Sequence, residues 1–191
     1  ECLAVVHRDQ GLACTVNALV GRELKLKKSI AEKPSQKKGL IAGSGAAGLS
    51  AAVTAATRGH EVHVFEKESR IGGQLNLASA PPNRKEIGTL LEYYRRELLR
   101  LKVNVHLNEE LTSATARHMS ADTVIVAVGA RAVRPQIPGA DLPHVMNGWE
   151  CLSGSKETGD RCVVVGGGLV GIEVADHLAD HGKQVVLIAR S

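Results

Sequence analysis

A glycine pattern with the spacing GxGxxG occurs twice in this chain, as Gly43-Ser44-Gly45-Ala46-Ala47-Gly48 and as Gly166-Gly167-Gly168-Leu169-Val170-Gly171. In such a pattern the first glycine permits a tight turn, the second lets the backbone approach a pyrophosphate, and the third lets a helix pack closely on its strand. The phosphates bind to unpaired N–H groups at the positive end of the helix dipole. Two copies therefore predict two dinucleotide sites, an arrangement typical of proteins that move electrons from one dinucleotide to the other.

Both copies lie in the strand–helix–strand context that such a site needs. The predicted strand, helix and strand are residues 40–42, 46–58 and 61–65 for the first copy, and residues 162–165, 169–181 and 185–188 for the second. Gly59 and Gly182 follow the two helices, where glycine commonly ends a helix. The two units align without a gap, which favours a repeated fold over two chance glycine turns. The sequence therefore predicts an α/β fold with two Rossmann-like units.

The residues after the second strand of each unit indicate which dinucleotide binds. In the first unit they are Glu66 and Lys67, and a carboxylate at this place hydrogen-bonds the ribose hydroxyls of an adenosine. In the second unit they are Ala189 and Arg190. A carboxylate would repel a 2′-phosphate, whereas an arginine can pair with it. We expect FAD at the first site and NADPH rather than NADH at the second. The alternative for Arg190 is a solvated surface arginine.

Composition excludes other classes of function. Of the 191 residues, 43% are hydrophobic and only 2% aromatic, so the core is expected to be aliphatic. The net charge of +4 is too small to indicate nucleic-acid binding, and no aromatic and basic stacking surface accompanies it. The uncharged run 40–57 is long enough to suggest a membrane span, but its glycines and its fit to a strand–turn–helix argue against one. With no signal peptide visible, we expect a cytoplasmic protein that binds neither nucleic acid nor membrane.

Further elements are predicted between the two units. The apolar pattern indicates a helix over 84–101, a strand over 103–107 and a buried strand over 122–128 that ends at Gly129. The stretch 67–84 is expected to be a long loop, and loops of this length inside a domain are usually functional. Three prolines in residues 130–150 predict a crossing between two lobes.

Other reactive side chains form no recognisable catalytic group. Cys151 and Cys162 are expected to be inert, the latter at the start of a buried strand. The sequence has no CxxC pair, so a disulfide-reductase mechanism lacks the residues it needs. His177 and His181 could together bind a metal, but without further ligands we expect two exposed helix residues. No side chain here is expected to be a catalytic acid or base.

The N-terminal segment resembles the iron–sulfur region of a flavoprotein family. The matching residues are Cys2-Leu3, Gly11-Leu12-Ala13-Cys14-Thr15-Val16-Asn17 and Gly21-Arg22-Glu23-Leu24. The family includes 2,4-dienoyl-CoA reductase, 2-enoate reductase, trimethylamine dehydrogenase and related NADH oxidases. In it a [4Fe-4S] cluster is held by a Cys-x2-Cys-x3-Cys run and a fourth cysteine twelve positions on. Cys2 and Cys14 match the third and fourth ligands, and the first two would precede Glu1. A cubane needs four thiolates, so half a site is expected here.

The resemblance runs the whole length of the chain. Residues 43–66 resemble the FAD site of the family, as does the loop Arg70-Ile71-Gly72-Gly73-Gln74-Leu75, which would pass the FAD pyrophosphate and flavin. Residues 122–129 resemble the Ala-Thr-Gly strand beside the FAD, ending at Gly129, with Val128 in place of the threonine. In the family an N-terminal TIM barrel carries FMN and binds the small-molecule substrate, and nothing of that barrel is present.

The resemblance implies a reaction and a domain plan. Hydride would pass from NAD(P)H to FAD, then single electrons through the cluster to FMN, which would reduce an activated alkene such as an enoyl thioester or an enoate. The alternatives are an amine dehydrogenase of the trimethylamine dehydrogenase type, a nucleotide-binding module without turnover, and a disulfide reductase, which the missing CxxC disfavours. The expected parts are a partial iron–sulfur segment at 1–24, a lysine-rich linker at 25–38, the FAD-binding domain at 39–150 and the first unit of an NAD(P)-binding domain at 151–191. We expect a C-terminal fragment, inactive alone, and the sequence predicts no oligomeric state.

Overall fold

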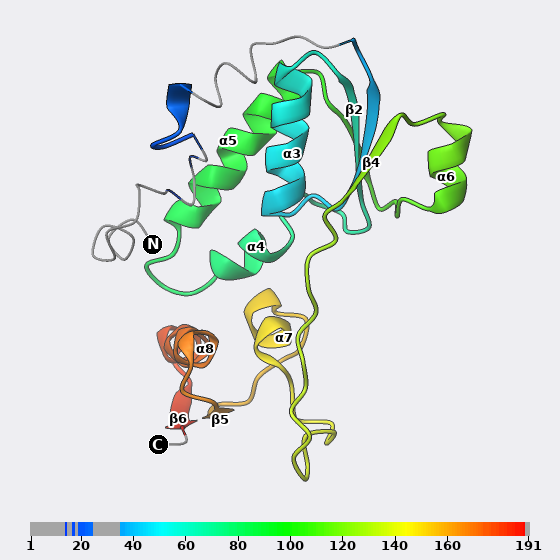
Figure 1. Ribbon diagram of the computed structural model, residues 1–191. Helices are drawn as coiled ribbons and strands as arrows, with labels where there is room; N and C mark the ends of the chain where they lie inside the picture. The colour runs from blue at the N-terminus through cyan, green and yellow to red at the C-terminus, as the bar shows by residue number, and fades with distance from the viewer. Residues whose placement is uncertain (1–13, 15–16, 18, 25–34, 190–191) are drawn as a thin grey trace.

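The computed structural model describes residues 14, 17, 19–24 and 35–189. They form two α/β lobes, which are joined by an extended crossover (Figure 1). We call residues 35–126 the first lobe, 127–147 the crossover and 148–189 the second lobe. No helix among the described residues is long and apolar enough to span a membrane.

The first lobe is built on a parallel sheet of four strands in the order β3-β2-β1-β4. The strands are β1 (Lys38–Ala42), β2 (Glu61–Glu66), β3 (Asn104–Leu107) and β4 (Thr123–Val126). In the register, Ile41 of β1 lies opposite Val64 of β2 and Ile125 of β4. All four strands therefore end at one edge of the sheet, where the turn after β1 emerges.

Helices cover one face of this sheet. They are α3 (Ala46–Thr57) and α5 (Glu86–Arg100), with the short α4 (Gln74–Ala78) between them in the chain. The short α6 (Ser113–His118), which precedes β4, lies on the opposite side of the sheet (Figure 1). The core between helices and sheet is aliphatic apart from one tyrosine, and its buried members are Ile41, Leu49, Ala52, Val62, Val64, Ile71, Leu91, Tyr94 and Leu98. This agrees with the small aromatic content of the sequence.

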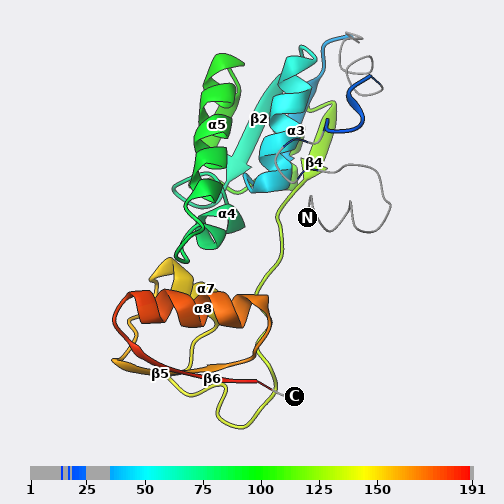
Figure 2. The same ribbon diagram turned by 90° about the vertical axis from the view of Figure 1, so that its left-hand side faces the viewer.

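The second lobe repeats the same unit in a smaller form. Its elements are α7 (Gly148–Ser153), β5 (Arg161–Val165), α8 (Leu169–Asp180) and β6 (Gln184–Ile188). The two strands pair in parallel, and α8 lies over them, roughly along their length (Figure 2). Val174 and Leu178 of α8 form a small buried core with Cys151 of α7. The α/β class and both predicted strand–helix–strand units are thus confirmed.

The structure corrects the predicted burial of two strands. β4 is shorter than the predicted 122–128, and all its side chains are exposed, with Val126 at 73%. It is the edge strand, and α3 packs mainly against β1 and β2. Cys162 was expected in a buried strand, but β5 alternates half-buried and exposed side chains because α8 covers one of its faces. A run of valines shows that a strand can be buried, while the neighbouring elements decide whether it is.

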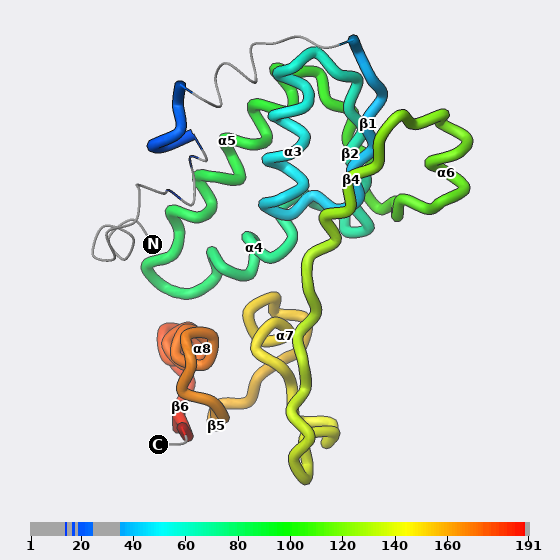
Figure 3. Tube along the Cα trace, viewed as in Figure 1, coloured from blue at the N-terminus to red at the C-terminus, as the bar shows by residue number. Residues whose placement is uncertain are grey.

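Three short helices were not predicted. α4 lies inside the stretch 67–84 that was expected to be a loop, α6 precedes β4, and α7 follows the crossover. The first two are too short for an apolar repeat to show. α7 does carry a readable signal, because Asn147 and Glu150 form a capping box at its start. The path of the crossover from β4 to α7 can be followed in Figure 3.

Candidate nucleotide-binding sites

The first glycine turn joins the end of β1 to the start of α3. Gly43 has a positive φ of 97°, which favours glycine, and its N–H donates to Phe65 O at 2.8 Å. A Cβ at Gly43 would collide with the carbonyl oxygen of Ala127, just after β4. The turn is therefore tight on two sides, and it passes directly over the carboxyl ends of three neighbouring strands.

The other two glycines of the first pattern have opposite surroundings. A Cβ at Gly48 would collide with the backbone oxygen of Gly43, so the third glycine allows α3 to pack on the turn. A Cβ at Gly45 would meet no atom within 4 Å. Gly45 is the N-cap of α3, which has no side-chain cap, and Ala46 and Ala47 are exposed on its first turn. The N–H groups of this turn therefore face open space that a pyrophosphate can fill.

Glu66 is buried at the end of β2, with 6% of its surface exposed. Its Oε2 accepts hydrogen bonds from Ser44 N at 3.0 Å and from Ser44 Oγ at 2.6 Å, and its Oε1 accepts one from Glu68 N at 3.0 Å. Burial raises the pKa of the carboxyl, but the bonds from Ser44 and Glu68 together lower that pKa below its ordinary value. The Glu66 carboxylate is thus ionised at neutral pH and fixed beside the glycine turn, while Lys67 is exposed.

The predicted site residues of the loop 70–75, and Gly129 three residues after the end of β4, converge on this turn. Gly72 N donates to Ser44 O at 2.9 Å, and a Cβ at Gly73 would stand 3.2 Å from Gly45 Cα. A Cβ at Gly129 would lie 3.3 Å from Gln74 Nε2. The structure therefore brings Gly73, Gln74 and Gly129 to the same sheet edge as the glycine turn. Ser44, which sequence reasoning passed over, is the residue that ties the turn to both Glu66 and the 72–75 loop.

The second glycine turn has the same geometry. Gly166 has φ 123°, and its N–H donates to Ile188 O at 2.8 Å. Gly168 is the N-cap of α8, without a side-chain cap, and a Cβ there would meet nothing within 4 Å. A Cβ at Gly171 would collide with Gly166 O. Leu169 and Val170 are exposed on the first turn of α8. The helix start is again open for a pyrophosphate.

The two turns differ where the ribose would bind. The aligned partners of Ser44 and Glu66 are Gly167 and Ala189, and a Cβ at Gly167 would stand only 2.5 Å from Ala189 Cβ. The second site thus lacks both the carboxylate and the hydroxyl that holds it. Arg190, the predicted partner of a 2′-phosphate, lies outside the described residues.

Part of the predicted iron–sulfur segment is described. Cys14 Sγ accepts a hydrogen bond from Asn17 N at 3.4 Å. A backbone N–H three residues on is a suitable donor to a thiolate that binds a cluster, since hydrogen bonds to the sulfurs tune such centres. Cys14 therefore fits the role of a cluster ligand. Cys2, the other predicted ligand, lies outside the described residues.

The structure also tests the predictions made for Cys151 and His177. Cys151 is buried, and burial raises the pKa of its thiol, which fits an inert residue. His177 was expected to be an exposed helix residue and is instead half-buried, with Nδ1 3.2 Å from Ala80 O of the first lobe. The contact arises because α8 packs beneath the segment that follows α4.

Comparison with known proteins gives consistent matches. Residues 37–191 match the family described as pyridine nucleotide-disulphide oxidoreductase. The chain is 39% identical to a bilirubin reductase of Mediterraneibacter gnavus, over 98% of this chain and 29% of the relative, and 39% identical to an NADH oxidase of Thermoanaerobacter brockii, over 96% and 29%. The solved structure of a 2-naphthoyl-CoA reductase in complex with 2-naphthoyl-CoA superposes with a TM-score of 0.90 at 32% identity, covering 96% of this chain and 28% of that one. The chain thus spans less than a third of the length of each of these proteins.

Proposed function

Because this chain belongs to the pyridine nucleotide-disulphide oxidoreductase family, and within it to the flavoproteins that its motifs resemble, we propose that it binds FAD and NAD(P)H side by side and passes electrons between them. The first glycine turn would take FAD and the second NAD(P)H. The disulphide chemistry in the family's description needs a redox-active cysteine pair, and this sequence has no CxxC. We propose that the electrons leave by another route.

One observation carries the proposal. Both α3 and α8 begin at a glycine whose missing Cβ faces open space, Gly45 and Gly168, while the third glycine of each pattern is packed against backbone. Folding alone does not require glycine at the second position of the pattern, because a side chain there would meet no protein atom. The repeated open position fits two pyrophosphates, each on the uncapped start of a helix.

The residues around the first turn would hold the FAD. The N–H groups of Ala46 and Ala47 would donate to its pyrophosphate, and the ionised carboxylate of Glu66 would accept from the ribose. Because Oε1 of Glu66 has only one described donor, Glu68 N, this oxygen can accept a second hydrogen bond. Gly73, Gln74 and Gly129 would line the path toward the flavin.

The second turn would favour NADPH over NADH. Gly167 and Ala189 leave the ribose position without an acidic group, and Arg190, the next residue in the sequence, would add a cation. A 2′-phosphate would therefore find no repulsion at this place and one charge-assisted partner. Leu169 and Val170 would lie along the pyrophosphate on the first turn of α8.

Beyond this chain we propose the larger electron path that the resemblance implies. When bound, FAD would accept hydride from NAD(P)H, a [4Fe-4S] cluster would pass its electrons on one at a time, and an FMN would collect two of them to reduce an activated alkene, such as an enoyl thioester or an enoate. Cys2 and Cys14 would be two of the four cluster ligands. The reductases among the relatives support a reductive direction.

The test is reduction of the flavin in the full-length protein. FAD-loaded enzyme mixed with NADPH or NADH without oxygen should lose its visible flavin absorbance. Bleaching by an amine, but by neither nicotinamide nucleotide, would instead support the amine dehydrogenase alternative. If neither treatment bleaches the flavin, the chain is a nucleotide-binding module without turnover.

A further inference from the structure

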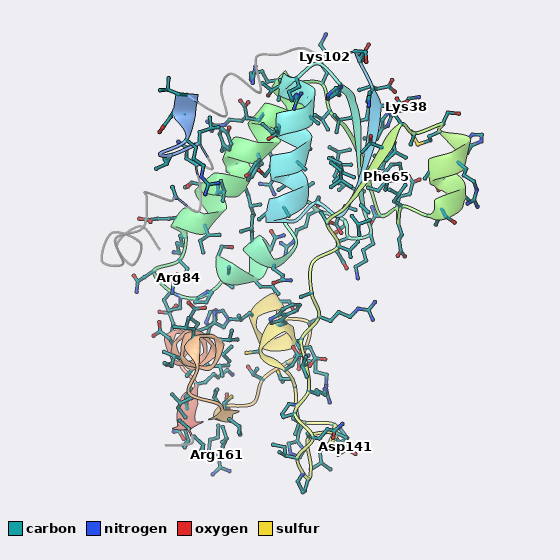
Figure 4. All side chains as sticks on the ribbon, viewed as in Figure 1. Lys38, Phe65, Arg84, Lys102, Asp141 and Arg161 are labelled. Atoms are coloured by element: carbon teal, nitrogen blue, oxygen red, sulfur yellow. The ribbon has the colours of Figure 1, made fainter. Side chains whose placement is uncertain are left out.

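Two polar contacts join the first lobe to α8 of the second lobe. Arg84 Nη2 forms an ion pair with Glu173 Oε1. Ala80 O accepts a hydrogen bond from His177 Nδ1 at 3.2 Å, and because a carbonyl can only accept, this ring nitrogen carries the proton. Glu173 and His177 are four residues apart, so both lie on one face of α8. Figure 4 shows Arg84 on the side of the first lobe that faces this helix.

These contacts connect the elements that carry the two open helix starts. Ala80 and Arg84 lie in the segment between α4 and α5, and α4 begins directly after Gly73, which stands against Gly45 of the first turn. Glu173 belongs to the helix that begins at Gly168. A short path of bonded elements thus runs from one pyrophosphate position to the other. α4 also packs against α7, which supports the same junction.

The crossover that links the two lobes has no regular secondary structure that would fix their relative orientation. The crossover, residues 127–147, contains neither helix nor strand. Its two ends are tied down, since Ala127 N donates to Ala42 O at 2.8 Å, Lys156 Nζ donates to Val145 O at 3.4 Å, and Arg134 donates to Ala140 O at 3.0 Å and reaches Glu150 at 3.5 Å. These contacts hold each end of the crossover to the lobe beside it, and none of them joins one lobe to the other. Among the described residues, the hydrogen bond at Ala80 and the ion pair at Arg84 span the two lobes, beside the packing of α4 against α7.

We propose that Arg84, Glu173 and His177 are positioning residues that hold the two nucleotide sites in the mutual orientation that hydride transfer requires. The inference rests on the proposed function, because it concerns the transfer between those two sites. A half-exposed ion pair stabilises a fold little. A displacement of reacting groups by about 1 Å can nevertheless lower a rate by about a hundredfold. The pair therefore matters for the geometry between the lobes rather than for their stability.

The experiment uses full-length, FAD-loaded protein and the rate constant for flavin reduction at saturating NADPH. Arg84→Met and Glu173→Gln should each lower this rate constant by roughly tenfold, with FAD content unchanged. The exchange Arg84→Glu with Glu173→Arg should recover most of the loss. His177→Asn, which can place an amide N–H where Nδ1–H lies, should stay near wild type, while His177→Leu should not. The matched control is Arg95→Met, which breaks an ion pair with Glu92 inside α5 and should change nothing.

A second readout does not depend on turnover. Arg131 lies in the crossover and precedes Ala132, so trypsin can cut there when the lobes separate, whereas the Arg134–Pro135 bond resists trypsin. Arg84→Met and Glu173→Gln should be cut faster than wild type, and the exchanged pair and Arg95→Met at the wild-type rate. Unchanged reduction and unchanged cutting in both single variants would overturn the inference. If wild-type protein is reduced by neither NADPH nor NADH, the proposed function fails, and the cutting assay still decides whether the contacts hold the lobes together.

Discussion

Replacing Gly45 by valine separates folding from cofactor binding. A Cβ at Gly45 would meet no protein atom within 4 Å, and its φ of −71° is accessible to any residue. The folding cost is therefore limited to the weaker N-cap preference of valine, about 1 kcal/mol. The added methyl groups would stand where the pyrophosphate must approach the start of α3. Gly45→Val should thus fold and fail to load FAD.

The size of the binding loss follows from the hydrogen bonds at this helix start. Two N–H groups donating to a charged phosphate contribute about 1.5–3 kcal/mol each. Losing both weakens FAD binding by about 3–6 kcal/mol, or more than roughly a hundredfold. The assay is the FAD content of purified full-length protein, with far-UV circular dichroism and Tm of the apoprotein measured in parallel.

Two matched glycine variants calibrate this result. Gly88 lies inside α5, and a Cβ there would also meet nothing within 4 Å; Gly88→Ala should load FAD fully and gain about 0.5–1 kcal/mol in stability. Gly48→Ala would drive a Cβ into the oxygen of Gly43 and should impair both folding and FAD loading. Full FAD loading of Gly45→Val would refute the placement of the pyrophosphate at the start of α3.

Three further predictions concern Glu66, the cluster and the nucleotide preference. Because the pKa of Glu66 is lowered in the folded protein, its ionised form stabilises the fold at neutral pH and this contribution is lost as pH falls through the folded-state pKa. Ser44→Ala should therefore lower the Tm of the apoprotein at pH 7, by the equivalent of about 1.5–3 kcal/mol, and this difference from wild type should narrow in acid. A difference independent of pH would contradict this account, and Ser153→Ala at the exposed end of α7 is the control, expected within about 0.5 kcal/mol. In the full-length protein, Cys14→Ser should remove the cluster, as iron and sulfide analysis would show, while NADPH still reduces FAD. The 191-residue chain alone should hold no intact cluster, so four irons and four sulfides per chain would disprove the ligand assignment. Arg190→Ala should reduce the preference of FAD reduction for NADPH over NADH by roughly ten- to a hundredfold, whereas a native preference for NADH that the substitution leaves untouched would make Arg190 a surface residue.

Local features of this protein were predictable from the sequence because their causes lie within a few residues. Gly43 and Gly166 adopt positive φ at the predicted turns, and Gly59 follows the end of α3 with φ 85°. The strands and helices around both turns have enough apolar residues at a regular spacing to be recognised. Even the open position at Gly45 was implied by the pattern, since only its role beside a pyrophosphate explains the second glycine.

Tertiary structure alone decided which residues meet across the chain. Ser44 and Glu66 are bonded because the turn after β1 lies beside the end of β2. Gln74 approaches Gly129, and Arg84 reaches Glu173, although no periodicity relates residues so far apart. The exposure of Val126 likewise follows from which elements pack against β4. A valine has the same chemistry in a buried strand and at a sheet edge, so the sequence does not reveal this exposure. Backbone turns and apolar periods are local properties of a sequence, whereas burial and long-range pairing depend on how the finished elements pack.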